Sequence, residues 1–237
     1  MTLRAALVLV LSVLFAASAF VWRFSGYEEG QLPVILADPP MQPAGWAFAI
    51  WGPIYVWLVA SAAWGVWRRR DDPAWDATRA PLIVSLGAGV PWLAVASAPG
   101  QWAPLAATGL ILVMLWGAVR ATLAAPRTER LQLRGALGLY AGWLTAASAV
   151  SVGLLGAGYG LLLPPAGWAL VVAGLATAVA VGVLLRRGVG TYAAAVAWAL
   201  VAVGARNDWS GPGLAALACA LVVMAVWGWA RTRPQPS

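Results

Sequence analysis

One run of residues, 43–67, constrains the fold more than any other part of the chain. It reads PAGWAFAIWGPIYVWLVASAAWGVW and is followed at once by three arginines. At a rise of about 1.5 Å per residue, a helix of this length crosses a hydrocarbon core of about 30 Å. Arginine clusters mark the cytoplasmic ends of membrane helices, so the run predicts a helix that ends in the cytoplasm. Pro53 is expected to bend this helix and to open space beside Trp51 and Tyr55.

Composition supports a membrane protein for the whole chain. Only 10% of the residues are charged and 62% are hydrophobic, with a mean hydropathy of +0.80. Soluble domains carry about 25% charged residues. The net charge of +7 comes from arginines that flank apolar runs, and this pattern is typical of topology signals. We therefore expect a lipid bilayer as the surrounding medium and no nucleic-acid partner.

Eight apolar runs divide the chain and predict an all-α, polytopic membrane helix bundle. If the N-terminus is cytoplasmic, thirteen of the fifteen arginines fall in cytoplasmic segments. Such a bias is hard to obtain with a wrong helix count, so we predict eight transmembrane helices with both termini inside, forming a single membrane domain over residues 1–237. The predicted helices cover 1–21, 43–67, 80–97, 102–119, 135–155, 167–185, 190–205 and 213–230.

Two features of this layout have alternative interpretations. The first run ends in Ala17, Ser18 and Ala19, so it is either a cleaved signal peptide or a retained helix, and its length favours retention. The sequence PAGWA occurs at residues 43–47 and again at 165–169. This repeat indicates either a duplication of four helices plus four, or an independent choice of the same residues for two helix starts.

The loops between the helices are also predicted. Residues 23–42 are polar and rich in proline, which forbids a long helix there. We expect this segment to be an extracytoplasmic loop over the helix ends, with Glu28, Glu29 and Asp38 facing water. Residues 71–79 are expected to be a short cytoplasmic loop.

Several kinds of chemistry lack the residues that they need. The chain has no histidine and one cysteine, Cys219, so we expect no disulfide within the chain, no metal site and no cofactor. No acidic or basic side chain falls in the middle of a predicted helix, which disfavours ion-coupled transport. An enzyme would need an acid, a base, a nucleophile or a metal, and we expect the protein not to be one.

Five of the sixteen tryptophans lie at membrane depth rather than at the interfaces: Trp51, Trp57, Trp92, Trp143 and Trp198. Each indole N–H needs an acceptor in a place without water. The simplest interpretation is packing against glycine and alanine. The functional interpretation is a shared pocket in the outer half of the membrane, beneath the 23–42 loop.

Three stretches resemble the TspO/MBR tryptophan-rich sensory proteins, and in particular a longer branch of that family. They are GWAFAIWGPIY at 45–55, LYAGWLT at 139–145, and Tyr192 followed by Trp198 and Ala199. The resemblance implies a helical membrane protein, expected in a bacterial plasma membrane, that binds porphyrins or other flat apolar molecules in a cavity. A homodimer is left open.

The candidate ligand-binding residues combine depth with this resemblance: Trp51, Tyr55, Tyr140, Trp143, Ser151 and Trp198. Ser151 stands where the branch usually has an asparagine. Since there is no histidine to ligate haem iron, a metal-free tetrapyrrole, a carotenoid, a sterol-like lipid or a quinone is expected as the ligand. The sequence thus predicts a sensor or carrier. The alternative is a structural or partner-binding membrane protein without a small-molecule ligand.

Overall fold

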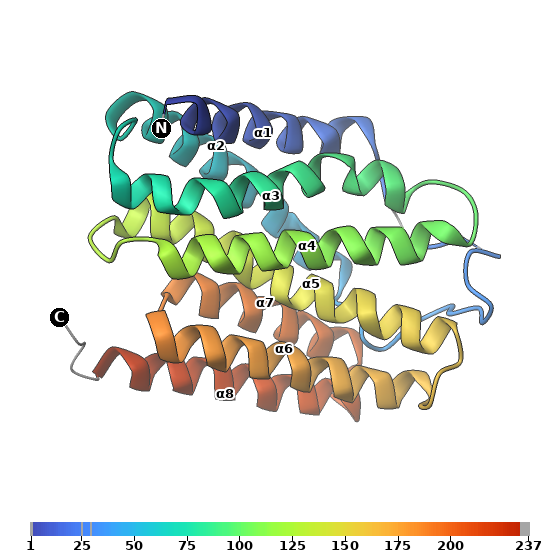
Figure 1. Cartoon of the computed structure of the whole chain (residues 1–237). Helices are drawn as coiled ribbons and strands as arrows, with labels where there is room; N and C mark the ends of the chain where they lie inside the picture. Colours follow the sequence, from blue (N-terminus) through green and yellow to red (C-terminus); the bar gives the residue numbers. More distant parts are fainter. Residues whose placement is uncertain (1, 25, 29, 233–237) are drawn as a thin grey trace.

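The computed structural model describes residues 2–24, 26–28 and 30–232. Across these residues the chain forms α-helices and two short helical turns, and no strand (Figure 1). The prediction of an all-α bundle with eight helices is therefore confirmed. The helices are α1 (Thr2–Val21), α2 (Trp51–Arg68), α3 (Pro73–Ala96), α4 (Trp102–Ala124), α5 (Ala136–Gly158), α6 (Pro165–Arg187), α7 (Gly190–Arg206) and α8 (Pro212–Thr232).

Helix length and hydropathy agree with a membrane-spanning bundle. Seven of the described helical segments are long and apolar enough to cross a membrane, while α7 is apolar but has only 17 residues. Successive helices run up and down, so both ends of the chain lie at the same end of the bundle (Figure 1). We call this the arginine-rich end, and the opposite end, which carries the 22–44 loop, the outer end.

Helix α5 is the central helix of the bundle. It packs against α2, α4, α6 and α7, and 67% of its apolar window is buried, more than in any other described span. Its contact with α7 depends on Gly142, since a Cβ there would lie 2.4 Å from the carbonyl oxygen of Tyr192. Small residues allow close backbone approach in membranes, where burial in lipid gives little driving force of its own.

The start of α3 differs from the expected loop at residues 71–79. The helix begins at Pro73, because Asp72 caps it and accepts a hydrogen bond from the amide of Ala74 at 2.9 Å. Proline suits the first helical position, where the missing N–H has no partner in any case. Trp75, assigned to the loop from the sequence, is only 3% exposed and packs into the core.

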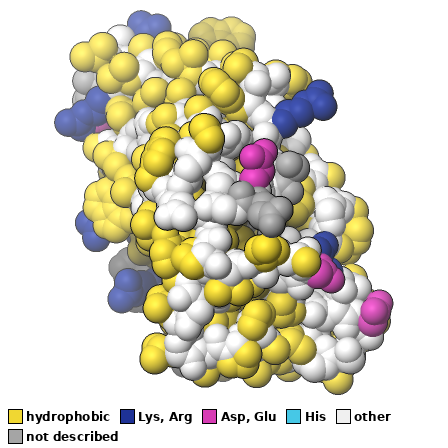
Figure 2. Space-filling view, turned by 90° about the vertical axis from the view of Figure 1, so that its right-hand side faces the viewer, with side chains coloured by type: hydrophobic (Ala, Val, Ile, Leu, Met, Phe, Trp, Pro, Cys, Tyr) yellow, Lys and Arg dark blue, Asp and Glu magenta, His cyan; other side chains and the backbone are white. Residues whose placement is uncertain are grey.

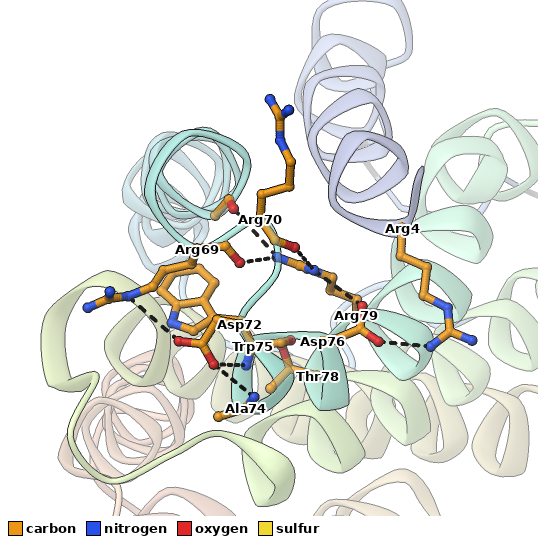
Figure 3. A network of polar contacts seen from close by, with 10 residues as sticks. Arg4, Arg69, Arg70, Asp72, Ala74, Trp75, Asp76, Thr78 and Arg79 are labelled. Atoms are coloured by element: carbon orange, nitrogen blue, oxygen red, sulfur yellow. Dashed lines mark hydrogen bonds and ion pairs between the residues drawn. The ribbon is translucent and has the colours of Figure 1, made fainter. Parts of the chain in front are cut away.

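Arg79, expected in the same loop, is a buried residue of α3 that joins three helices (Figure 3). Its guanidinium donates to the carbonyl oxygens of Arg69 at 2.6 Å and Arg70 at 2.7 Å, and so caps the C-terminal end of α2. It also pairs with Asp76 at 3.2 Å, which in turn binds Arg4 of α1 at 3.1 Å. One buried cation thus fixes the ends of α1, α2 and α3 together.

Helical geometry changes in two places. Residues Gly45–Ile50 form a 3₁₀ helix (η1), and the α-helix starts only at Trp51. Pro53 therefore lies in the first turn of α2 rather than within a continuous 43–67 helix, so that expected helix is divided in two. Residues Arg130–Gly135 form a π-helical turn (η2) directly before α5, where the sequence predicted a loop up to residue 134.

The 22–44 loop covers the outer end. The amide of Val34 donates to Gly158 at 2.8 Å, and that of Ala44 donates to Ala202 at 3.0 Å, so the loop is attached to α5 and α7. Asp38 pairs with Arg206 and remains mostly exposed, as does Glu28, whereas Glu29 lies outside the described residues. Seen from this end, the acidic side chains form separate spots on a surface that is largely hydrophobic or uncharged, and one of them adjoins a basic side chain (Figure 2).

Candidate functional site

A partly open cavity lies under the 22–44 loop, between the start of α2 and helices α5, α6 and α7. Its volume is about 100 Å³. The walls are apolar: Phe48, Trp51 and Trp143 on one side, and alanine, valine and leucine side chains of α5, α6 and α7 on the other. No Asp, Glu, Lys or Arg lines it among the described residues. Such a site suits the binding of a neutral, apolar group.

Aromatic side chains from η1, α2 and α5 meet at the cavity. The ring centroids of Trp51 and Trp143 are 6.1 Å apart with planes at 82°, and Phe48 meets Trp143 edge-on at 5.7 Å. Trp51 also stacks on Tyr55 at 5.3 Å with planes only 15° apart. Edge-to-face and stacked pairs are the favourable arrangements of aromatic rings. The second and fifth predicted helices therefore do pack side by side at this depth.

Two of the candidate residues lie behind the cavity wall rather than in it. Tyr140 is fully buried, and its hydroxyl lies 3.0 Å from the hydroxyl of Ser85 on α3. Tyr55 contacts both Trp51 and Phe15 of α1, and the ring centroids of Tyr55 and Phe15 are 5.2 Å apart. Neither tyrosine lines the cavity, so each supports the aromatic wall from behind.

The polar groups of the wall are few. Trp143 is 2% exposed, and its indole Nε1 is buried without a hydrogen-bond acceptor. Leaving such a donor unpaired costs about 1–3 kcal/mol. Ser151 lines the cavity about two turns further along α5. Its hydroxyl donates to the carbonyl of Ala147 at 3.0 Å, which leaves the oxygen able to accept. The buried indole N–H of Trp143 and the hydroxyl of Ser151 are therefore two groups of the wall to which a ligand could bind.

The rim of the cavity belongs to the loop. Phe24, Tyr27, Met41 and Gln42 line it from the outer side, and Phe24 contacts both Tyr27 at 5.1 Å and Trp92 of α3 at 6.4 Å. Burial raises the pKa of Tyr27 to about 12, and the nearby hydroxyl of Thr108 offsets part of that shift. Tyr27 therefore stays protonated and neutral at physiological pH.

Trp198 lies elsewhere. It is 41% exposed on α7, its indole donates to the carbonyl of Ala47 at 3.0 Å, and its ring meets Trp46 edge-on at 4.8 Å. It does not line the cavity. Trp198 thus holds η1 against α7, and its N–H is satisfied by a backbone carbonyl of the 3₁₀ helix.

Sequence reasoning missed several wall residues. Phe48 lines the cavity and lies within the 45–55 motif, but it is not among the predicted site residues. Phe15 of α1 does not line the cavity; it meets Trp51 from behind the wall with ring centroids 5.8 Å apart, and only its depth marks it in the sequence. The α6 side of the cavity, which includes Val172 and Ala173, is made of small apolar residues that look like any other helix face. Trp92 was noted for its depth and lines the rim, where its indole donates to Ala107 at 3.1 Å.

Comparison of the sequence with models of known protein families identifies the family of this chain. The family model described as "TSPO-like protein" matches residues 2–230. The chain belongs to this family. Together with the apolar helices, membership makes it an integral membrane protein and suggests a ligand-binding role. No curated protein and no solved structure matches the chain.

Proposed function

We propose that this protein is a ligand-binding sensor or carrier, in a bacterial plasma membrane, for a flat and largely apolar molecule that bears a hydrogen-bond acceptor. The observation that carries the proposal is the unpaired Nε1 of Trp143 in the wall of an apolar cavity. A carbonyl, ether or ring nitrogen placed there would accept from it. We propose no catalysis, since the lining contains no Asp, Glu, Lys or Arg in the described part of the chain.

Affinity in a membrane has to come from specific contacts. A ligand arriving from lipid gains little from burial, because acyl chains are as apolar as the cavity. Stacking on Trp51 or Trp143 adds about 0.5–1.5 kcal/mol per good pair, and pairing the indole N–H recovers about 1–3 kcal/mol. These terms favour conjugated ligands with acceptors, such as metal-free tetrapyrroles and quinones, over saturated lipids.

Cavity size sets a further condition. Sites for drug-sized ligands enclose about 300–1,000 Å³, whereas this cavity has about 100 Å³. A quinone ring or one edge of a tetrapyrrole can occupy that space, and a complete tetrapyrrole requires the rim at Met41 and Gln42 to move outward. We therefore propose that the 22–44 loop yields when the larger ligands bind.

Binding to the purified protein tests the proposal. Protoporphyrin IX and a short-chain ubiquinone would be titrated in detergent micelles, with thermal stabilisation as the measurement. Trp143→Phe keeps an aromatic ring but removes the N–H, and should weaken binding by about tenfold. Trp227→Phe is the matched control, because Trp227 does not line the cavity. Absence of saturable binding for both probes would support the structural alternative instead.

A further inference from the structure

A second pocket lies at the arginine-rich end, remote from the aromatic cavity. We call it the arginine pocket. It has a volume of about 540 Å³ and opens between η2, the turn from α6 to α7, and the last turn of α8. Its charged residues come from three separate segments of the chain: Arg127, Arg130, Arg134, Arg187 and Arg231.

The charge in this pocket is of one sign. None of the described residues that line it is acidic. The acidic side chains of the neighbouring loops are engaged elsewhere, since Glu129 pairs with Arg69 at 2.8 Å and Asp76 pairs with Arg4 and Arg79. Five arginines that line one pocket carry positive charges that repel one another.

Several side-chain donors in the pocket are buried away from water, and among them Nε of Arg134 and Nε1 of Trp227 have no hydrogen-bond acceptor. The guanidinium of Arg134 is held in place, because its Nη2 donates to the backbone carbonyl of Arg187. The Trp227 ring is held too, by Arg231 stacked 4.9 Å above it and by Gly190, where a Cβ would lie 3.0 Å from the ring. Donors that are fixed and unpaired are prepared for an acceptor that comes from outside.

Helix α7 begins at the same place. Its first turn, Gly190 onward, has no side-chain cap, and Gly190 and Thr191 line the pocket. The Thr191 hydroxyl is also buried without a partner. Backbone N–H groups and the positive end of the helix dipole attract anions at such a position. These donors add to the charge of the arginines, and they point to the same kind of ligand.

Arginines gather at the cytoplasmic ends of membrane helices, and this tendency explains on which side of the membrane the pocket arginines lie. It does not explain why they surround one pocket that contains unpaired donors. Topology needs positive charge only, and Arg68, Arg70 and Arg120 supply it from exposed positions outside the pocket. It gives no reason for Arg134 and Trp227 to hold buried donors without acceptors around a shared space. A bound anion explains both the clustering and the unpaired donors.

We propose that the arginine pocket binds the phosphate group of an anionic ligand, with Arg134, Arg187, Trp227 and the first turn of α7 as donors. Guanidinium groups suit phosphate because their N–H groups form a planar fork that matches two of its oxygens. At the edge of a membrane the phosphate can belong to an anionic phospholipid headgroup or to a soluble phosphate compound. The chemistry of the site is the same for both.

The test compares neighbouring arginines in the full-length protein. Detergent micelles would be supplemented with short-chain phosphatidylglycerol, short-chain phosphatidylcholine, or pyrophosphate, with chloride at equal ionic strength as the reference. The shift of the unfolding midpoint with concentration gives an apparent affinity. Arg187→Gln removes a guanidinium but keeps the carbonyl that binds Arg134, and should weaken phosphate binding by about tenfold. Arg186→Gln, next to it but outside the pocket, should leave the affinity unchanged.

The outcomes separate the two sources of phosphate. Stabilisation by phosphatidylglycerol alone supports a lipid headgroup, and stabilisation by pyrophosphate supports a soluble compound. Trp227→Phe keeps an aromatic ring but removes the N–H, and it should weaken the binding of whichever phosphate probe stabilises the protein by about threefold. The proposal is overturned if neither phosphate probe stabilises more than phosphatidylcholine or chloride, or if Arg186→Gln weakens binding as much as Arg187→Gln does.

Discussion

Phe15 connects the first helix to the aromatic wall, and its removal should destabilise the whole bundle. The side chain is fully buried and meets Trp51, Tyr55 and Tyr140 edge-on at 5.8, 5.2 and 5.8 Å. It also fills the notch at Gly89 of α3, where a Cβ would lie 2.9 Å from the ring. We expect Phe15→Ala to lower the stability more than any substitution on the lipid-facing side of α1.

The magnitude follows from these contacts. In water-soluble proteins a buried Phe→Ala substitution costs about 3–5 kcal/mol, part of which is transfer of the ring out of water. That part is small here, since in the separated state the ring of Phe15 would face acyl chains. Three edge-to-face pairs at about 0.5–1.5 kcal/mol each give a loss of about 1.5–4.5 kcal/mol, and the cavity left behind adds to it.

Reversible unfolding by SDS in mixed micelles measures this difference. Phe20→Ala is the matched control, because Phe20 lies on the same helix and is 88% exposed. Its cost should stay within about 0.5 kcal/mol. Equal and small effects of the two substitutions would refute the reasoning. They would mean that α1 does not pack against α2 and α5, as for a signal peptide that has been removed.

Three further predictions concern other parts of the chain. Gly142→Ala should lower stability by about 1–3 kcal/mol, because the new Cβ would meet the backbone of α7, which cannot move aside. Gly174→Ala is the control, since open space surrounds Gly174, and SDS unfolding compares the two variants. The free energy of unfolding should fall between pH 10 and about 12, because the Tyr27 hydroxyl ionises at a lower pH in the unfolded chain than in the folded protein. Unfolding midpoints measured against pH should therefore fall less steeply for Tyr27→Phe than for the unaltered protein. Reporter fusions after Arg134 and after Asp208 should read cytoplasmic and external respectively, and the same reading from both would contradict the arginine-based topology.

The bundle was accessible to sequence reasoning because two strong signals agree. Apolar runs define the helices, and the uneven distribution of arginines fixes their number. The errors fall where a helix extends beyond its apolar part. The first turn of α3 looks like a polar loop in sequence, yet Asp72 and Pro73 are a helix-start signal and Trp75 packs inward. Arg79 was counted as a loop residue although it caps α2 from within the bundle.

The candidate cavity was only partly accessible. Depth and the family resemblance together predict that Trp51 and Trp143 meet, and their ring centroids lie 6.1 Å apart. Trp198 could not be placed, because depth does not fix which way a residue faces around the helix axis, and it lies on the exposed side of α7. Tyr140 was chosen for its motif and proves to be a buried contact to Ser85. The α6 wall and Phe15 carry no pattern that separates them from ordinary packing.

The π-helical turn before α5 has a consequence for the relation between the two sites. In this turn the amide of Arg134 donates to Glu129, five residues back, which adds one residue compared with an α-helical turn. One residue corresponds to a rotation of about 100° around the helix axis. A one-residue change in length at η2 would therefore turn Arg130 toward a different face while Gly142 and Trp143 keep their contacts. We therefore expect that a change of length in this turn alters the arginine pocket and leaves the α5 residues of the aromatic cavity in place.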